Sequence, residues 1–214
     1  MTLTSRDLAL PVIGIVGGIG SGKSAVAREA SRKRPWFVLD ADQIGHQTLL
    51  LPEIITKLTE QFGPHILDAD GLLNRSAIAR EVFGPDRQEQ KKQLEAIVHP
   101  HIRRLAADQL LEAAQSGQYN RLILDAAILF EAGWRSLCDV VVFIDTDWNR
   151  RLERVKATRD WDADELRKRE ASQLSLEEKR NLADAIIPNN GDLSTAVNLL
   201  IDYVDRQFPH DPPT

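Results

Sequence analysis

Residues 12 to 24 read Val-Ile-Gly-Ile-Val-Gly-Gly-Ile-Gly-Ser-Gly-Lys-Ser. The first five are mainly β-branched and apolar, which predicts a buried strand, and the last eight match the spacing G-x-x-x-x-G-K-[ST]. Glycines in such a loop permit positive φ and let backbone N–H groups surround phosphate oxygens. The stretch therefore predicts a strand, a phosphate-binding loop and a helix, in a protein that binds a nucleoside triphosphate.

The loop residues have distinct predicted roles. Lys23 brings a positive charge to the β- and γ-phosphates, and Ser24 offers a hydroxyl to Mg²⁺. A helix that begins near Gly22 adds its N-terminal N–H groups and its dipole. The predicted nucleotide-binding residues of this stretch are Gly17, Gly18, Gly20, Ser21, Gly22, Lys23, Ser24 and Ala25. A chance match is the alternative, and the loop alone does not separate kinases from GTPases, ATPases or motors.

Length and composition limit the class of protein. The chain has 214 residues, 43% hydrophobic and 28% charged, which is typical of a globular protein with one core and room for an inserted lobe. Its net charge of -5 argues against nucleic acid as the main ligand. We find no membrane span and no signal peptide, so we expect a cytoplasmic protein with no membrane partner. The only cysteine, Cys138, is expected to be reduced and packed.

A second strand is predicted at residues 36–39, after a helix that Pro35 ends. It closes a β-α-β unit and implies a parallel sheet. Asp40-Ala41-Asp42 follows, and in an extended segment both carboxylates would lie on the same side, at the ligand-bearing edge of the sheet. One of them can instead cap a helix beginning near Gln43, and we expect one role for each. A carboxylate near the γ-phosphate can accept a proton from an attacking hydroxyl.

Residues 45–118 predict an inserted helical lobe, because they separate the second and third strands by far more than a crossover requires. Helices are predicted at 76–83 and from 86 to about 115, and Asp68-Ala69-Asp70-Gly71 predicts a turn. Pro100 should bend or restart the long helix, which could aim His99 and Arg103 toward a bound phosphate or ribose. The alternative for the histidines near Pro100 is a pair of surface or capping groups.

Three further strands complete the predicted sheet, at residues 121–125, 140–144 and 183–187. The first ends in Asp125, which beside the loop is a candidate Mg²⁺ ligand, although a strand-end Asp is often only a cap. The apolar rim after it, residues 126–131, could line an acceptor pocket. Asn189, Asn190 and Gly191 could meet the adenine. An amphipathic helix at 193–208 should cover the sheet, and residues 209–214 should be disordered.

Residues 149–182 are rich in arginine. Such segments are usually solvated helix faces, but a closing lid must bring guanidinium groups onto the developing phosphoryl charge. The predicted fold is therefore α/β, a P-loop NTPase with three α/β/α layers, a five-stranded parallel sheet, an inserted helical substrate lobe and a helical lid. The single domain is divided into a core at 11–44, 119–148 and 183–208, the lobe at 45–118 and the lid at 149–182.

Taken together, the motifs form a more specific pattern than the loop alone. It comprises Gly17 to Ser24, Asp40-Ala41-Asp42, Leu67 to Gly71 with Arg75, Ile97 to Arg103, Leu129-Phe130-Glu131, Arg159-Asp160, Arg169, Gln173 and Asn189-Asn190-Gly191. This pattern closely resembles the dephospho-coenzyme A kinase family over nearly the whole chain. The resemblance implies ATP-dependent phosphorylation of the ribose 3′-hydroxyl of dephospho-CoA, the last step of coenzyme A synthesis.

The resemblance also implies roles for individual residues. Asp42 would be the general base or would orient the hydroxyl, and Lys23 and Arg169 would stabilise the transferring phosphoryl. Ser24 and Asp125 would hold Mg²⁺. The acceptor site would be lined by Asp42, His99, Arg103, Leu129, Phe130 and Glu131. Where the family usually has Val-Pro-Leu-Leu-Phe-Glu, this chain has Ala-Ala-Ile-Leu-Phe-Glu, so the rigid turn set by proline is lost at Ala127.

Two other functions stay open at this point. One is another small-molecule P-loop kinase, such as a nucleoside monophosphate kinase, which shares the loop, an inserted lobe and an arginine-rich lid. The other is a nucleotide-binding regulatory protein without an acceptor. On the main hypothesis the partners are ATP and dephospho-CoA, the cofactor is Mg²⁺, and the chain is a monomer.

Overall fold

The computed structural model describes residues 4–82, 84 and 86–209. The chain divides into two compact units. The larger unit combines Met1–Asp40 with Gln109–Thr214, and the smaller one is the insertion Ala41–Asp108. The tail predicted to be disordered falls mostly on residues 210–214, outside the described residues.

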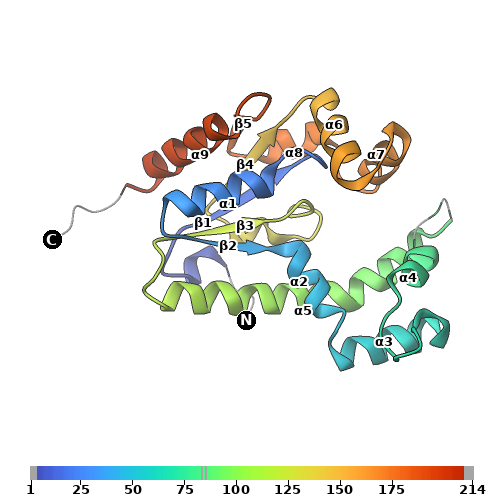
Figure 1. Ribbon diagram of the computed structural model, residues 1–214. Coiled ribbons are helices and arrows are strands. Elements are labelled where there is room, and N and C mark those ends of the chain that lie inside the picture. The colour runs from blue at the N-terminus through green and yellow to red at the C-terminus, as the bar shows by residue number, and fades with distance from the viewer. Residues whose placement is uncertain (1–3, 83, 85, 210–214) are drawn as a thin grey trace. The chain divides into compact units, whose positions relative to one another are not determined.

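The larger unit is built on a five-stranded parallel sheet (Figure 1). Its strands are β1 (Val12–Gly17), β2 (Trp36–Asp40), β3 (Arg121–Asp125), β4 (Val140–Asp145) and β5 (Ala185–Pro188), in the order β2-β3-β1-β4-β5. The predicted parallel sheet is confirmed. The register pairs Asp125 with both Ile15 and Asp40. The carboxyl ends of β1, β2 and β3 therefore meet at one edge, beside the glycine loop.

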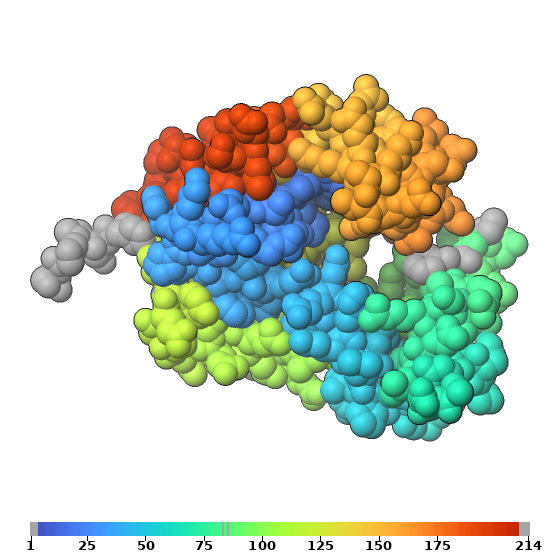
Figure 2. All heavy atoms as spheres, viewed as in Figure 1, coloured from blue at the N-terminus to red at the C-terminus, as the bar shows by residue number. Residues whose placement is uncertain are grey.

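Helices cover both faces of the sheet, as the predicted three layers require. On one face, α1 (Lys23–Lys33) and α9 (Leu193–Gln207) bury apolar side chains against β1, β3 and β4, and the two helices lie side by side (Figure 2). On the other face, α8 (Leu176–Leu182) packs against β1. A Cβ at Gly14 would lie 2.7 Å from Leu129 Cδ1, so only glycine lets the chain after β3 approach β1 this closely.

The arginine-rich segment is helical, as expected. It forms α6 (Trp148–Arg159), α7 (Ala163–Glu170) and α8, which follow one another after β4 (Figure 1). Side chains fix two of the helix starts: Asp162 accepts a hydrogen bond from the Glu165 amide at 2.8 Å, and Ser175 forms a capping box with Glu178. Short 3₁₀ helices occur at Ser5–Asp7 and Trp134–Leu137.

The inserted unit has a core of its own. It contains α2 (Ala41–Thr48), α3 (Pro52–Phe62), a 3₁₀ turn (Pro64–Ile66), α4 (Arg75–Val82) and most of α5 (Gln88–Gln115). The core of this unit is formed by Ile54, Leu58, Ile66, Ile78 and Val82. The predicted long helix is confirmed as one continuous helix through Pro100, which therefore does not restart it. A single missing donor is tolerated inside so long a helix. Residue 83, the expected last residue of α4, lies outside the described residues.

The helix after β2 begins earlier than the sequence predicted. It starts at Ala41, directly after the strand, rather than near Gln43. Asp40 therefore ends a strand while Asp42 lies in the first turn of a helix, and the expectation that both carboxylates share one extended segment was wrong. The β2–β3 ladder ends at the pair Asp40–Asp125, and alanine, a strong helix former, follows at once.

Among the described residues, no helix has both the length and the apolar character that crossing a membrane requires.

Candidate functional site

Three residues predicted for the donor site meet at the end of the glycine loop. The ammonium of Lys23 lies 2.6 Å from Asp125 Oδ1 and 3.4 Å from Ser24 Oγ. Asp125 is only 1% exposed, so the ammonium compensates a carboxylate that is otherwise buried. Lys23 begins α1 immediately after Gly22, and Asp125 ends β3, the neighbour of β1. The sheet therefore places a lysine, a hydroxyl and a carboxylate at one point.

The donor atoms at this point suit Mg²⁺. Magnesium prefers oxygen ligands and is usually held by one or two protein groups together with substrate phosphates. The carboxylate of Asp125 and the hydroxyl of Ser24 are such groups. The described residues contain no cluster of three or more histidine, cysteine or acidic side chains that could hold a metal ion without a substrate. These residues therefore fit a magnesium ion that enters with a nucleotide.

The loop conformation depends on glycine. Gly20 and Gly22 have φ of 79° and 85°, in the left-handed region that other residues rarely adopt. A Cβ at Gly20 would also lie 2.8 Å from the Arg151 carbonyl oxygen. The predicted phosphate-binding conformation therefore needs glycine both for its backbone angles and for the approach of α6.

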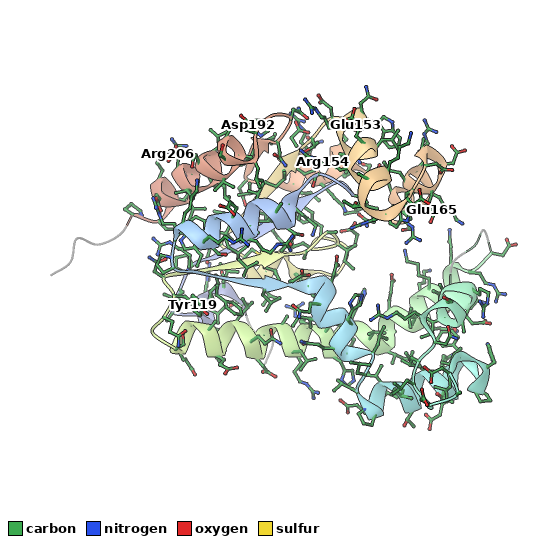
Figure 3. The ribbon with its side chains drawn as sticks, viewed as in Figure 1. Tyr119, Glu153, Arg154, Glu165, Asp192 and Arg206 are labelled. Carbon is green, nitrogen blue, oxygen red and sulfur yellow. The ribbon has the colours of Figure 1, made fainter. Side chains whose placement is uncertain are left out.

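Side chains from α6 and from the residues that follow β4 and β5 support the loop from outside. The carbonyl oxygen of Ser21 accepts hydrogen bonds from Thr146 Oγ1 at 2.9 Å, Arg154 Nη1 at 2.9 Å and Asn189 Nδ2 at 2.7 Å. Arg154, labelled in Figure 3, also donates to the carbonyl oxygens of Gly20 and Asn189. Burial lowers the pKa of Arg154, and repulsion from Arg150 lowers it further. These bonds fix the loop without any ligand.

Two of the three residues after β5 that were predicted to meet adenine form hydrogen bonds within the protein. Asn189 is 2% exposed, and its side-chain amide donates to the loop. Asn190 Oδ1 accepts a hydrogen bond from the Asp147 amide at 2.8 Å. Gly191 has open space around its Cβ position. The predicted contact of these three residues with adenine stays a prediction, and Asn189 has a second role, in holding the loop, that the sequence did not reveal.

The arginines of α6 and α7 fall into two groups. Arg151 is buried, pairs with Glu170, and donates to the Thr146 and Ile19 carbonyl oxygens at 3.1 and 3.3 Å. Arg169 is half exposed, with Nε 2.6 Å from Glu165 Oε1 and its guanidinium 4.1 Å from the Trp161 ring centre. Arg151 supports the loop, whereas Arg169, the predicted catalytic arginine, contacts Glu165 and Trp161 within the arginine-rich segment.

The segment after β3 is held tightly. Leu129 is fully buried against β1, so its side chain supports the segment, while Phe130 is partly exposed. Glu131 Oε1 accepts a hydrogen bond from the Leu174 amide and pairs with Lys179 Nζ, both at 2.9 Å. Sequence reasoning missed Lys179. It sits in the run Leu-Glu-Glu-Lys-Arg, where nothing distinguishes it from a solvated charge.

The inserted unit carries the other predicted acceptor residues. Asp42 lies in the first turn of α2, and His99 and Arg103 lie on α5. A Cβ at Gly45, about one turn after Asp42, would lie 3.8 Å from Ile102 Cδ1. The two helices therefore approach each other next to Arg103, and the predicted polar residues belong to one part of this unit.

A cavity of about 240 Å³ adjoins Gly18 of the loop. Its polar lining includes Arg151, Asp145 and Arg180, and the guanidinium of Arg180 lies 2.6 Å from Asp145 Oδ2. The cavity is lined from the ends of β1 and β4 and from α8. The carboxyl-end edge of the sheet is therefore hollowed beside the loop.

A parallel sheet with this strand order, a glycine loop ending in Lys-Ser and an aspartate at the end of the neighbouring strand define the class of P-loop kinases. Comparison with known proteins specifies the family. The family model for dephospho-CoA kinase matches residues 11–195. The chain belongs to the dephospho-CoA kinase family.

Individual relatives agree over almost their whole length. A dephospho-CoA kinase from Carboxydothermus hydrogenoformans is 34% identical over 201 residues, 93% of this chain and 95% of the relative. One from Rhodopirellula baltica is 35% identical over 193 residues, 89% of this chain and 88% of the relative. The crystal structure of TT1252 from Thermus thermophilus is 31% identical, with a TM-score of 0.80, and the match covers 94% of this chain and 99% of that one.

Proposed function

We propose that this kinase transfers the γ-phosphoryl group of ATP to the ribose 3′-hydroxyl of dephospho-CoA. Membership of the dephospho-CoA kinase family supports the two substrates. The observation that carries the proposal is the meeting of Lys23, Ser24 and Asp125 at a glycine loop whose backbone is already fixed. A loop in this state is ready to receive the phosphates of the donor.

The donor half acts by neutralising charge. Mg²⁺, held by Ser24 and Asp125, would neutralise negative charge on the β- and γ-phosphates when it is bound. The ammonium of Lys23 would move from the Asp125 carboxylate to the phosphates, since it then meets a larger negative charge. The N–H groups of the loop and of the first turn of α1 complete the cradle.

The acceptor half acts by positioning. In an in-line transfer with a loose transition state, most of the rate comes from holding the hydroxyl in line and from neutralising charge, and removal of the proton is late. Asp42 would orient the 3′-hydroxyl and accept its proton. His99, Arg103, Phe130 and Glu131 would bind the rest of the acceptor, with Leu129 as their buried support.

The lid supplies the last positive charge. Arg169 would leave Glu165 and contact the transferring phosphoryl when both substrates are bound. Residues 45–118 would act as the acceptor lobe and 149–182 as the lid of one kinase domain. We also propose that the kinase is a monomer and acts in the cytoplasm.

The choice of acceptor tests the proposal. The protein is incubated with Mg²⁺ and γ-labelled ATP, and separately with dephospho-CoA, AMP, UMP or no acceptor. We expect label to move to dephospho-CoA alone, with little hydrolysis in its absence. Transfer to AMP or UMP with none to dephospho-CoA would contradict the proposal, and rapid hydrolysis without any acceptor would favour a nucleotide-dependent regulatory protein.

The role of Asp42 is tested by Asp42→Asn. We expect kcat to fall by about 100-fold or more while the Kd for ATP changes less than about twofold, because the carboxylate acts on the acceptor hydroxyl and not on the donor. Asp70→Asn, at an exposed turn of the same unit, is the control and should leave both constants unchanged. Turnover near the wild-type value in Asp42→Asn would remove the base assignment.

A further inference from the structure

Lys179 is a charged residue with a completely buried side chain, and none of the roles above uses it. It lies on α8 immediately after the capping box, in which the Glu178 carboxylate accepts from the Ser175 amide at 3.0 Å and the Ser175 hydroxyl accepts from the Glu178 amide at 3.2 Å. Hydrogen bonds from Ser175 lower the pKa of Glu178. The box fixes the backbone from which Lys179 extends.

Three acceptors surround the ammonium of Lys179. They are the Ala127 carbonyl oxygen at 2.7 Å, Gln173 Oε1 at 2.8 Å and Glu131 Oε1 at 2.9 Å. The ammonium donates hydrogen bonds to Ala127 and Gln173 and forms an ion pair with Glu131. The Glu131 carboxylate also compensates the positive charge, which explains how a lysine can be buried here. An apolar residue at position 179 would leave all three acceptors without this partner.

The contacts of Lys179 with Ala127 and Glu131 fix the segment after β3 at both ends. Ala127 and Glu131 are four residues apart, and Leu129 between them is buried against β1. The Ala126 amide donates to the Ile15 carbonyl oxygen at 3.2 Å, which fixes the start of the segment to the sheet. Residues 127–131 are therefore held at the two ends by one ammonium and in the middle by an apolar contact.

The contact of Lys179 with Gln173 fixes the connection between α7 and α8. Gln173 lies in this connection. Its backbone N–H donates to the carbonyl oxygen of Glu170, the last residue of α7, at 3.0 Å. The next amide, that of Leu174, donates to the same Glu131 oxygen that pairs with Lys179. The ammonium thus joins the end of the arginine-bearing helix to the segment that contains Phe130 and Glu131.

We infer that Lys179 is a positioning residue for phosphoryl transfer, which holds residues 127–131 and the α7–α8 connection in one arrangement. The inference rests on the proposed function, because it takes Phe130 and Glu131 as part of the acceptor site. It also explains how this chain keeps a defined turn with alanine at position 127: the ammonium holds the Ala127 carbonyl, where a proline ring would have restricted the backbone.

Hydrogen exchange tests, without any substrate, whether Lys179 holds these two segments in place. In Lys179→Met, we expect amides of residues 126–134 and 171–176 to exchange roughly tenfold faster than in the wild type, with β1 and the loop unchanged, because only local opening is made easier. Gln173→Ala removes one acceptor and keeps the ammonium paired with the other two, so this variant should fold and show the same pattern more weakly. Unchanged exchange in both segments would overturn the inference.

Steady-state kinetics tests whether Lys179 positions the acceptor site. In Lys179→Met we expect KM for dephospho-CoA to rise roughly tenfold while KM for ATP changes less than about twofold, because the loop keeps its own supports. Val204→Ala, on the buried face of α9, is the destabilised control and should leave both KM values unchanged. Equal changes in both KM values would overturn the inference. A wild-type protein inactive on dephospho-CoA would contradict the proposed function instead, and hydrogen exchange would still decide the role of Lys179.

Discussion

The glycine loop and helix α7 both carry predicted catalytic groups, but the structure holds them differently. The loop is fixed by tertiary hydrogen bonds: three side chains, two of them buried, donate to the Ser21 carbonyl oxygen. Arg169 on α7 is half exposed and contacts Glu165 and Trp161 of its own segment. Exposed ion pairs contribute little to stability and exchange partners readily. The cradle for the donor is therefore built before binding, whereas Arg169 can change partner when substrates arrive.

Replacing the exposed arginine should give the largest effect. We expect Arg169→Ala to lower kcat by about 100- to 1000-fold, because it removes a charge that acts mainly on the transition state, and to change the free energy of unfolding by less than about 0.5 kcal/mol. The measurements are steady-state kinetics and denaturant unfolding. Arg167→Ala, on the same exposed helix, is the matched control. Equal losses in the two variants would show that α7 supplies only a general positive field.

Replacing an arginine that supports the loop should instead weaken ATP binding and lower the stability of the protein. We expect Arg154→Met to weaken ATP binding roughly tenfold and to lower the free energy of unfolding by about 2–3 kcal/mol, because three carbonyl oxygens lose a charged donor. Calorimetric titration with ATP and urea unfolding measure the two effects. Arg150→Met, exposed on the same helix, should change neither. Wild-type ATP affinity in Arg154→Met would contradict the view that α6 fixes the loop.

The smallest effect is expected at Cys138, beneath the loop strand. Burial raises the pKa of its thiol to about 12, so at neutral pH the thiol stays protonated in the native protein. We expect iodoacetamide to leave native protein unmodified at pH 8, measured by mass, and to label it once urea unfolds it. The thiol titrates near its ordinary value when unfolded, so its contribution to stability is full below about pH 9 and is lost as pH rises toward 12. Rapid labelling of native protein would show that this side of the sheet is open.

The meeting of Lys23, Ser24 and Asp125 could be predicted from the sequence because the information is local. Strand, loop and helix occupy consecutive residues, and Lys23 and Ser24 need only Asp125 at the end of a recognisable strand. The parallel sheet followed from the same β-α-β order. The start of α2 was misplaced by two residues, because the end of the β2–β3 ladder depends on a partner strand 85 residues further along the chain.

The supports of the site could not be predicted in the same way. Arg151, Arg154 and Lys179 lie in a run of charges that is typical of solvated helices, and only the fold shows which of them are buried. Asn189 was predicted to meet adenine, and the structure turns its amide to the loop. In each case the partner is a backbone carbonyl oxygen or a carboxylate brought near by tertiary packing, and these contacts leave no local pattern of residue types.

The position of the new phosphate is the most direct test of the whole account. Wild-type protein, Mg²⁺, ATP and dephospho-CoA are incubated, and the product is identified by mass and by ³¹P-coupled NMR of the ribose protons. We predict one added phosphoryl group, located on the ribose 3′-oxygen, together with an equal amount of ADP. ADP without a phosphorylated acceptor, or a phosphate at any other position, would contradict the account.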